Sequence, residues 1–153
     1  MAATYEPFMS QALQKSEGNK IYSSADAPGL ITDLLTFRTD FIDKYPETVD
    51  AILQAHFRGV EFWTKNPDEG NAIVGKILGV SKEEAAAQLT GINILSLDDN
   101  KVAFTPGTSL QSLYLNMKEV GKFVQAQRGS GSAQLDTDLL IEPKFINNLS
   151  TSK

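Results

Sequence analysis

The stretch from Tyr45 to Pro67 constrains the fold of this chain more than any other part of the sequence. Pro46 suits the first turn of a helix, where its missing N–H group would have no partner in any case. Apolar residues then recur at helical spacing as one continuous stripe: Val49, Ile52, Leu53, Phe57, Val60 and Trp63. We therefore expect a long helix that buries one face.

Composition places the chain among ordinary globular proteins and excludes several kinds of site. A length of 153 residues suffices for one domain with a core, and a hydrophobic content of 41% is typical. A net charge of -5 argues against a nucleic-acid surface, which is normally basic. The absence of cysteine excludes disulfides and thiolate zinc sites, and one histidine cannot supply a multi-histidine metal site. We expect no metal and no cofactor.

The N-terminal sequence M-A-A-T-Y-E-P-F has neither the basic region nor the apolar region of a signal peptide. No window approaches the run of about 18 apolar residues that a membrane-spanning helix needs. The sequence as written therefore predicts a cytoplasmic protein, which stays in the compartment where it was made.

Other parts of the sequence predict further helices and a few short strands. Helices are predicted over 7–15, 41–44, 67–78 and 81–89, and the third of these should end at Gly79. A second long helix should start at Thr108 or Ser109 and fray at 125–127, and a short helix should follow Pro143. Strands are predicted over 19–23 and 29–37, and 91–96 is expected to be extended. The stretch 97–104 is compatible with a helical turn or a loop.

Strands so short and so few cannot form an independently stable sheet. The predicted helices therefore resemble the outer layer of an α/β protein whose sheet strands lie mostly elsewhere.

Two acidic positions are candidates for a binding site. Glu6 stands between aromatic residues in Tyr5-Glu6-Pro7-Phe8, where it could line a ligand pocket. The alternative is a loop-to-helix junction, in which Pro7 opens the helix and the aromatic rings pack together. Asp33 interrupts the strand predicted over 29–37, and it could face solvent or point into a cleft.

Two other polar positions have simpler explanations. His56 could act as a base, but no residue stands in a triad relation to it, and a histidine at the edge of the core is the favoured interpretation. The run Asp98-Asp99-Asn100 lacks the spacing and glycine of a calcium loop, which favours a helix cap or turn.

Three segments follow one another in an order that matches a known family: Y-E-P-F-M-S-Q-A-L, then K-I-Y-S-S-A-D-A-P-G-L-I-T-D-L-L-T-F-R-T-D-F-I-D-K-Y-P-E-T-V, then N-P-D-E-G-N-A-I-V-G-K-I-L-G-V-S-K-E-E. From about Ala2 to Leu149, the chain resembles the second half of certain substrate-binding proteins of ABC importers. These proteins bind nitrate, sulfonates, taurine, bicarbonate or the thiamine pyrimidine precursor.

The resemblance implies an α/β fold: the helix-rich second half of a two-lobed periplasmic-binding-protein fold of type II, with few strands of its own. Residues 1–30 would end the second lobe and include a cleft-lining segment. Residues 31–149 would form a hinge-crossing strand and helices of the first lobe, and 150–153 would be a disordered tail. In this arrangement Tyr5, Glu6 and Asp33 would be the ligand-binding residues.

The function implied by the resemblance is non-catalytic binding of a small polar or anionic organic solute for import, with ABC permease subunits as partners and an extracytoplasmic location. One alternative is an enzyme on the same scaffold, which zero cysteines and one histidine disfavour. Another is a helical interaction or regulatory module derived from such a binder. An apolar face left by a missing lobe would favour a homo-oligomer.

Overall fold

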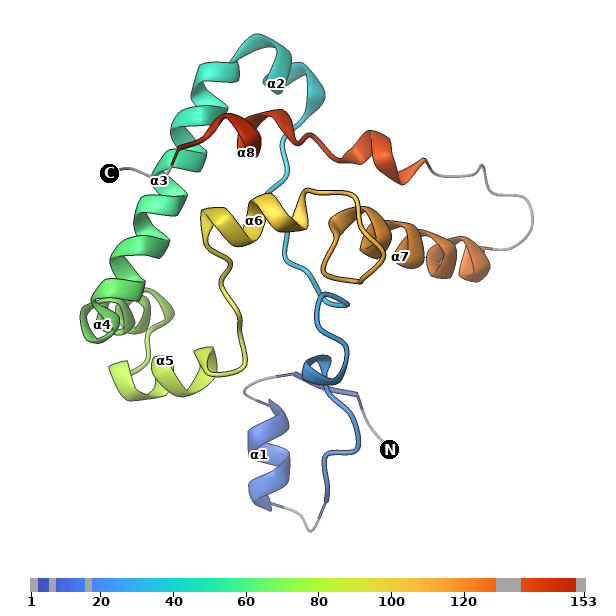
Figure 1. The fold of residues 1–153 in the computed structure, drawn as a ribbon. Coiled ribbons are helices and arrows are strands. Elements are labelled where there is room, and N and C mark those ends of the chain that lie inside the picture. The colour runs from blue at the N-terminus through green and yellow to red at the C-terminus, as the bar shows by residue number, and fades with distance from the viewer. Residues whose placement is uncertain (1–2, 6–7, 16–17, 129–135, 151–153) are drawn as a thin grey trace. The chain divides into compact units, whose positions relative to one another are not determined.

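The computed structural model describes residues 3–5, 8–15, 18–128 and 136–150, and no strand occurs within these ranges. They form helices joined by turns and irregular segments (Figure 1). The α-helices are α1 (Phe8–Lys15), α2 (Thr39–Lys44), α3 (Pro46–Lys65), α4 (Pro67–Leu78), α5 (Lys82–Leu89), α6 (Leu97–Ala103), α7 (Leu113–Arg128) and α8 (Lys144–Asn148). Two short 3-10 helices, η1 (Ser24–Asp26) and η2 (Thr137–Leu140), complete the set.

The chain divides into two compact units, which are described separately here. The first unit comprises Met1–Asp26 and Phe62–Ile94, and the second comprises Ala27–Glu61 and Leu95–Lys153. No helix in the described part of the chain combines the length and the apolar character that a membrane span requires.

Most of the helix predictions are confirmed. The prolines at 46 and 67 open α3 and α4, and Gly79 ends α4 with a φ of 71° in the left-handed region. In the ambiguous stretch 97–104, residues 97–103 are helical as α6 and Phe104 is its C-cap. The second long helix, however, starts later than predicted, at Leu113, and continues through Arg128 without fraying at 125–127.

The late start of α7 has a local cause at Ser112. Its hydroxyl donates to the carbonyl oxygen of Thr105 at 2.8 Å, and its N–H donates to the carbonyl oxygen of Ser109 at 3.0 Å. These bonds hold 109–112 as a turn, and Ser112 then accepts the first helical hydrogen bond from Asn116.

The two strand predictions, over 19–23 and 29–37, are wrong for the structure described, and the stretch 91–96, which was expected to be extended, contains no strand either. Residues 21–23, 32–38 and 92–96 are irregular, and no ladder hydrogen bonds join them to the described part of the chain. A strand is held by its neighbour, so extended sequence without a neighbouring strand remains a single extended segment. The described residues are therefore helix-rich, and they do not include a sheet of their own.

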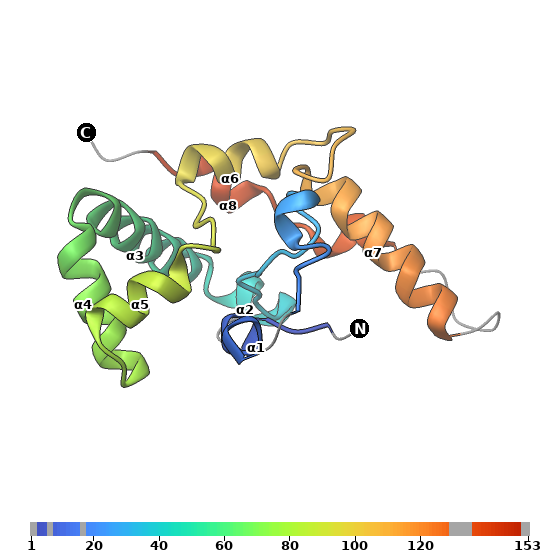
Figure 2. The same ribbon diagram turned by 90° about the horizontal axis from the view of Figure 1, so that it is seen from below.

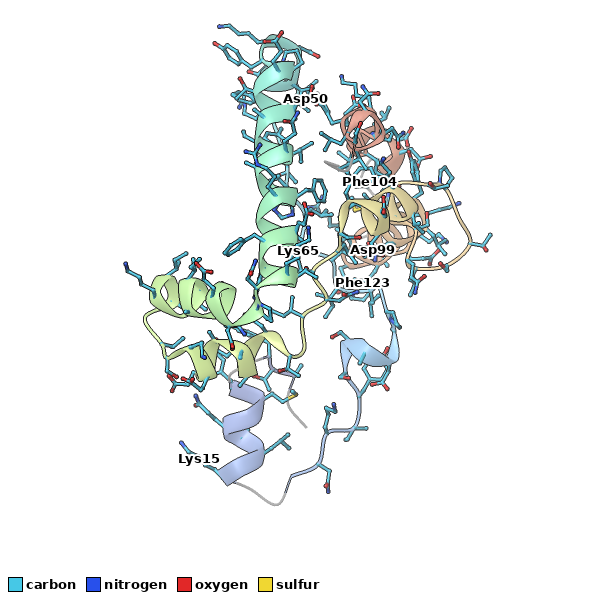
Figure 3. All side chains as sticks on the ribbon, turned by 60° about the vertical axis from the view of Figure 1, so that its left-hand side comes forward. Lys15, Asp50, Lys65, Asp99, Phe104 and Phe123 are labelled. Carbon is cyan, nitrogen blue, oxygen red and sulfur yellow. The ribbon has the colours of Figure 1, made fainter. Side chains whose placement is uncertain are left out.

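The second unit has a core built from α3, α6 and α8. Buried side chains come from all three helices and the residue after α8: Val49, Leu53, Leu97, Phe145, Ile146 and Leu149. Partly buried aromatics pack around this cluster, among them Phe37, Phe41 and Phe104. Phe104, directly after α6, is labelled in Figure 3. α6 and α8 lie side by side (Figures 1 and 2). Full burial of each large side chain contributes about 1.5–3 kcal/mol.

Only Val49 and Leu53 of the predicted stripe on α3 are buried. Val49 is 1% exposed and Leu53 is also buried, whereas Ile52 is exposed and both Val60 and Trp63 are only partly covered. The expectation of one continuous buried face on α3 is therefore too strong.

In the first unit, two glycines allow close packing around α4. Gly70 lies against the indole of Trp63, and an added Cβ would fall 2.2 Å from Trp63 Cδ1. The Trp63 Nε1–H donates to Asn71 Oδ1 at 3.0 Å, which fixes the ring on the start of α4. A Cβ on Gly75 would lie 2.9 Å from the Val80 carbonyl oxygen, so this glycine lets the turn between α4 and α5 fold tightly.

Capping boxes open α5 and α6, and in α5 the pair is Ser81 and Glu84. In α6 the Ser96 side chain accepts from the Asp99 N–H at 3.2 Å, and the Ser96 N–H donates to Asp99 Oδ2 at 3.0 Å. The Ser96 hydroxyl also donates to Asp99, and with the backbone N–H it holds the pKa of Asp99 below its usual range.

Gly70→Ala should destabilise the protein by about 1–3 kcal/mol, because the indole of Trp63 must move to admit the new methyl group. The matched control is Gly59→Ala in α3, where an added Cβ meets nothing within 4 Å. That control should stabilise by about 0.5–1 kcal/mol through helix propensity. Urea unfolding followed by the fluorescence of Trp63, the single tryptophan, measures both. Equal stabilisation by both substitutions would contradict the described packing.

Acidification should remove the contribution of Asp99 to stability. Because its pKa is lower in the folded chain than in the unfolded chain, this contribution is complete above the ordinary aspartate pKa of about 3.9 and disappears as the pH falls through the lower folded value. Unfolding curves of the wild type and Asp99→Asn should therefore differ at neutral pH and converge in acid. The same comparison in a Ser96→Ala background should show a smaller pH-dependent difference, and an unchanged one would refute the cap as its cause.

Candidate functional site

Tyr5 lies in the first unit, directly before α1. Its side chain is 73% exposed, and its ring makes an edge-to-face contact with Phe8 at a centroid distance of 5.5 Å. The Tyr5 carbonyl oxygen accepts from the Met9 N–H at 3.0 Å. The contact is what a loop-to-helix junction requires, and the exposure leaves Tyr5 accessible to a ligand. Glu6 and Pro7 lie outside the described residues.

Asp33 lies in the second unit, just after a turn that anchors its segment. The turn runs through Pro28 and Gly29, with the Leu30 N–H donating to the Ala27 carbonyl oxygen at 3.0 Å. Gly29 has a φ of 90°, which favours glycine, and an added Cβ would fall 2.2 Å from the carbonyl oxygen of Leu110. Glycine is therefore required here by both conformation and space.

A buried asparagine on α7 holds the same turn. Asn116 is only 4% exposed, and its side-chain amide donates to the Gly29 carbonyl oxygen. The Thr32 hydroxyl donates to that oxygen as well, at 2.9 Å. These bonds fix the start of the extended segment that carries Asp33.

The Asp33 side chain itself is exposed, and it makes no hydrogen bond or ion pair with the described part of the chain. Its neighbours Ile31, Leu34 and Leu35 are also exposed. Tyr5 belongs to the first unit and Asp33 to the second, so each is described within its own unit.

A charge pair follows this segment at the start of α2. Arg38 donates through Nε and Nη2 to the two carboxylate oxygens of Asp40, each at 2.9 Å. The Arg38 guanidinium holds the pKa of Asp40 below its usual range. Both side chains are highly exposed, so the pair is worth little to stability. Its consequence is chemical: two of the guanidinium donors are already engaged by a carboxylate of the same chain.

A family model for the NMT1-like family matches residues 1–79. The chain belongs to the NMT1-like family. Members of this family bind nitrate, sulfonates or thiamine precursors, and they are periplasmic binding proteins rather than enzymes. No protein with a curated description and no solved structure matches the chain.

The NMT1-like match covers α1 through α4 and includes Tyr5, Glu6 and Asp33. The resemblance to these importer proteins predicted from the sequence is therefore confirmed at the level of the family.

Two further sequence expectations are settled in opposite ways. His56 is exposed, not at the edge of the core, since it lies on the solvent side of α3 with its ring edge-to-face against Phe57 at 5.1 Å. The run Asp98-Asp99-Asn100 forms the first turn of α6, and Asp99 caps that helix, which confirms the cap.

The importance of Asn116 could not be predicted from the sequence, because nothing in a helix of mixed residues signals a contact 87 positions away.

Asn116→Ala should destabilise the protein by about 1–3 kcal/mol, because the Gly29 carbonyl oxygen loses a buried donor. Asn147→Ala, at an exposed position of α8, is the matched control and should change stability by less than about 0.5 kcal/mol. Chemical unfolding monitored by circular dichroism compares the two. If Asn116→Ala proves as harmless as the control, then this bond does not anchor the Asp33 segment.

Proposed function

We propose that this chain binds a small polar or anionic organic solute for import by an ABC transporter. The observation that carries the proposal is the NMT1-like match over residues 1–79. The candidate solutes are those of the resemblance: a sulfonate, taurine, nitrate, bicarbonate or a pyrimidine precursor. The role is binding without catalysis, and the closed form would be the one that permease subunits recognise.

In this proposal the chain supplies part of a two-lobed fold of the type II periplasmic-binding-protein class. Residues 1–30 end one lobe, 31–149 contribute a hinge-crossing strand and helices of the other lobe, and 150–153 form a tail. The extended segments at 32–38 and 92–96, which have strand-like sequence and no strand partner in the described chain, support this arrangement. Strands of the remaining part of a binder would then pair with them.

Tyr5, Glu6 and Asp33 are the proposed ligand-binding residues. Tyr5 offers an exposed aromatic face, and Asp33 offers a carboxylate that accepts no bond from the described part of the chain. Carboxylates at two of three positions favour a ligand with an amine or a ring nitrogen, such as taurine or a pyrimidine precursor, over nitrate or bicarbonate. An anionic group on such a ligand would be bound by backbone N–H groups.

A second candidate is a helical interaction or regulatory module derived from such a binder. The described residues expose 22 large apolar side chains and bury only eight hydrophobic ones. Where exposed apolar side chains form a contiguous patch, that patch is typical of a surface that contacts another polypeptide. This function would need no solute.

A thermal-shift screen against the candidate solutes tests the proposal. A ligand at about 100 times its dissociation constant stabilises the fold by about 2.7 kcal/mol, which raises the melting temperature by a few degrees. Asp33→Asn and Glu6→Gln should each reduce the shift. Asp43→Asn, which changes an exposed aspartate on α2, is the matched control and should not. A cooperative melt with no shift for any compound would favour the interaction module instead.

A further inference from the structure

Three polar side chains are buried among the described residues, and two of them, Ser112 and Asn116, lie in and just before the first turn of α7. The Ser112 hydroxyl donates to the Thr105 carbonyl oxygen at 2.8 Å and closes the loop that precedes α7. The Asn116 amide donates to the Gly29 carbonyl oxygen. Burying a polar group costs free energy unless its hydrogen bonds are made, so such a group specifies one arrangement where apolar packing permits several.

The turn at residues 27–32, called the Gly29 turn below, is held by two kinds of contact with this region. The main chain of the loop before α7 packs directly on it, since a Cβ on Gly29 would fall 2.2 Å from the carbonyl oxygen of Leu110. The Gly29 carbonyl oxygen also accepts two hydrogen bonds, one from Asn116 and one from the Thr32 hydroxyl at 2.9 Å. A carbonyl oxygen has two lone pairs, and these two donors match them. Packing therefore fixes the position of the Gly29 peptide, and hydrogen bonds fix its orientation.

Asp33 follows the Gly29 turn directly, because Thr32 is both the last residue of the turn and the residue before Asp33. The Asp33 side chain makes no hydrogen bond or ion pair with the described part of the chain. Within the described chain, its carboxylate is therefore placed by the main chain that precedes it. A charge-assisted hydrogen bond depends on distance and direction, so a displaced turn would weaken the contact of this carboxylate with a solute.

We propose that Asn116 is a positioning residue for the solute site. Its amide orients the Gly29 turn and so places the Asp33 carboxylate against the amine or ring nitrogen of the solute. This proposal rests on the proposed function, in which Asp33 binds the solute. It adds a residue that lies outside residues 1–79, the range matched by the family model. The affinity for the solute then depends on α7 as well as on the matched segment.

A double-mutant cycle between Asn116 and Asp33 tests this role. The dissociation constants of the whole chain for taurine and for the thiamine pyrimidine precursor are measured by isothermal titration calorimetry, at a temperature where unfolding curves show every variant to be folded. Asn116→Ala should weaken binding about tenfold. Asn116→Asp keeps the size of the side chain but replaces the amide donor with a carboxylate oxygen, and should weaken binding at least as much. In an Asp33→Asn background, Asn116→Ala should cost less than about twofold, because the carboxylate that it positions is already gone.

The matched control is Ile146→Val, which removes buried volume from the core of the same unit. It should lower stability and leave both dissociation constants unchanged, because it does not alter a donor to the Gly29 turn. A wild type that binds while Asn116→Ala binds equally well would overturn this proposal and leave the proposed function standing. An equal loss with and without the Asp33 carboxylate would do the same. A wild type that binds neither compound would remove the proposed site itself, and this proposal with it.

Discussion

The contact of α3 with α6 and α8 is the interaction on which the second unit depends. Val49 and Leu53 lie at the centre of a cluster with Leu97, Phe145 and Ile146, so residues about a hundred positions apart are held together by apolar burial. Phe37 and Phe41 pack against the same cluster and tie the end of the segment Ile31–Phe37 to it. At its other end, Gly29 and Asn116 fix the turn that precedes Asp33. The segment is thus anchored at both ends, and between them its backbone makes no hydrogen bond to the described residues.

The sequence predicts the parts of this fold whose causes are local. Proline at a helix start, glycine in a left-handed conformation and a Ser–Glu box act within one turn, and α3, α4 and α5 follow from them. The starting residue of α7 was mispredicted because Ser112 bonds to Thr105, outside the helix. The strand predictions failed for a related reason: β-prone sequence specifies an extended backbone, but a strand exists only where a neighbour supplies the other half of the ladder.

The candidate site was predicted only in part for similar reasons. Family membership rests on a run of motifs within residues 1–79, and Tyr5, Glu6 and Asp33 lie in that run. The exposure of Tyr5 and Asp33 and the anchoring of the Asp33 segment could not be read from the sequence, since Asn116 reaches that segment from a distant helix. His56 was expected at the edge of the core because helical spacing places it beside the apolar stripe of α3. Only Val49 and Leu53 of that stripe are buried, and His56 is exposed.

Residue-resolved amide hydrogen exchange in dilute solution tests the central claim most directly, namely that the segment Ile31–Phe37 is anchored at both ends yet has no backbone partner in the part of the chain that the structure describes. The account predicts that amides from Ile31 to Phe37 exchange at nearly unprotected rates, while the amide of Leu53 in the core of α3 exchanges far more slowly. Slow exchange throughout Ile31–Phe37, equal to that of Leu53, would mean that the segment is a paired strand within the single chain and would contradict the account.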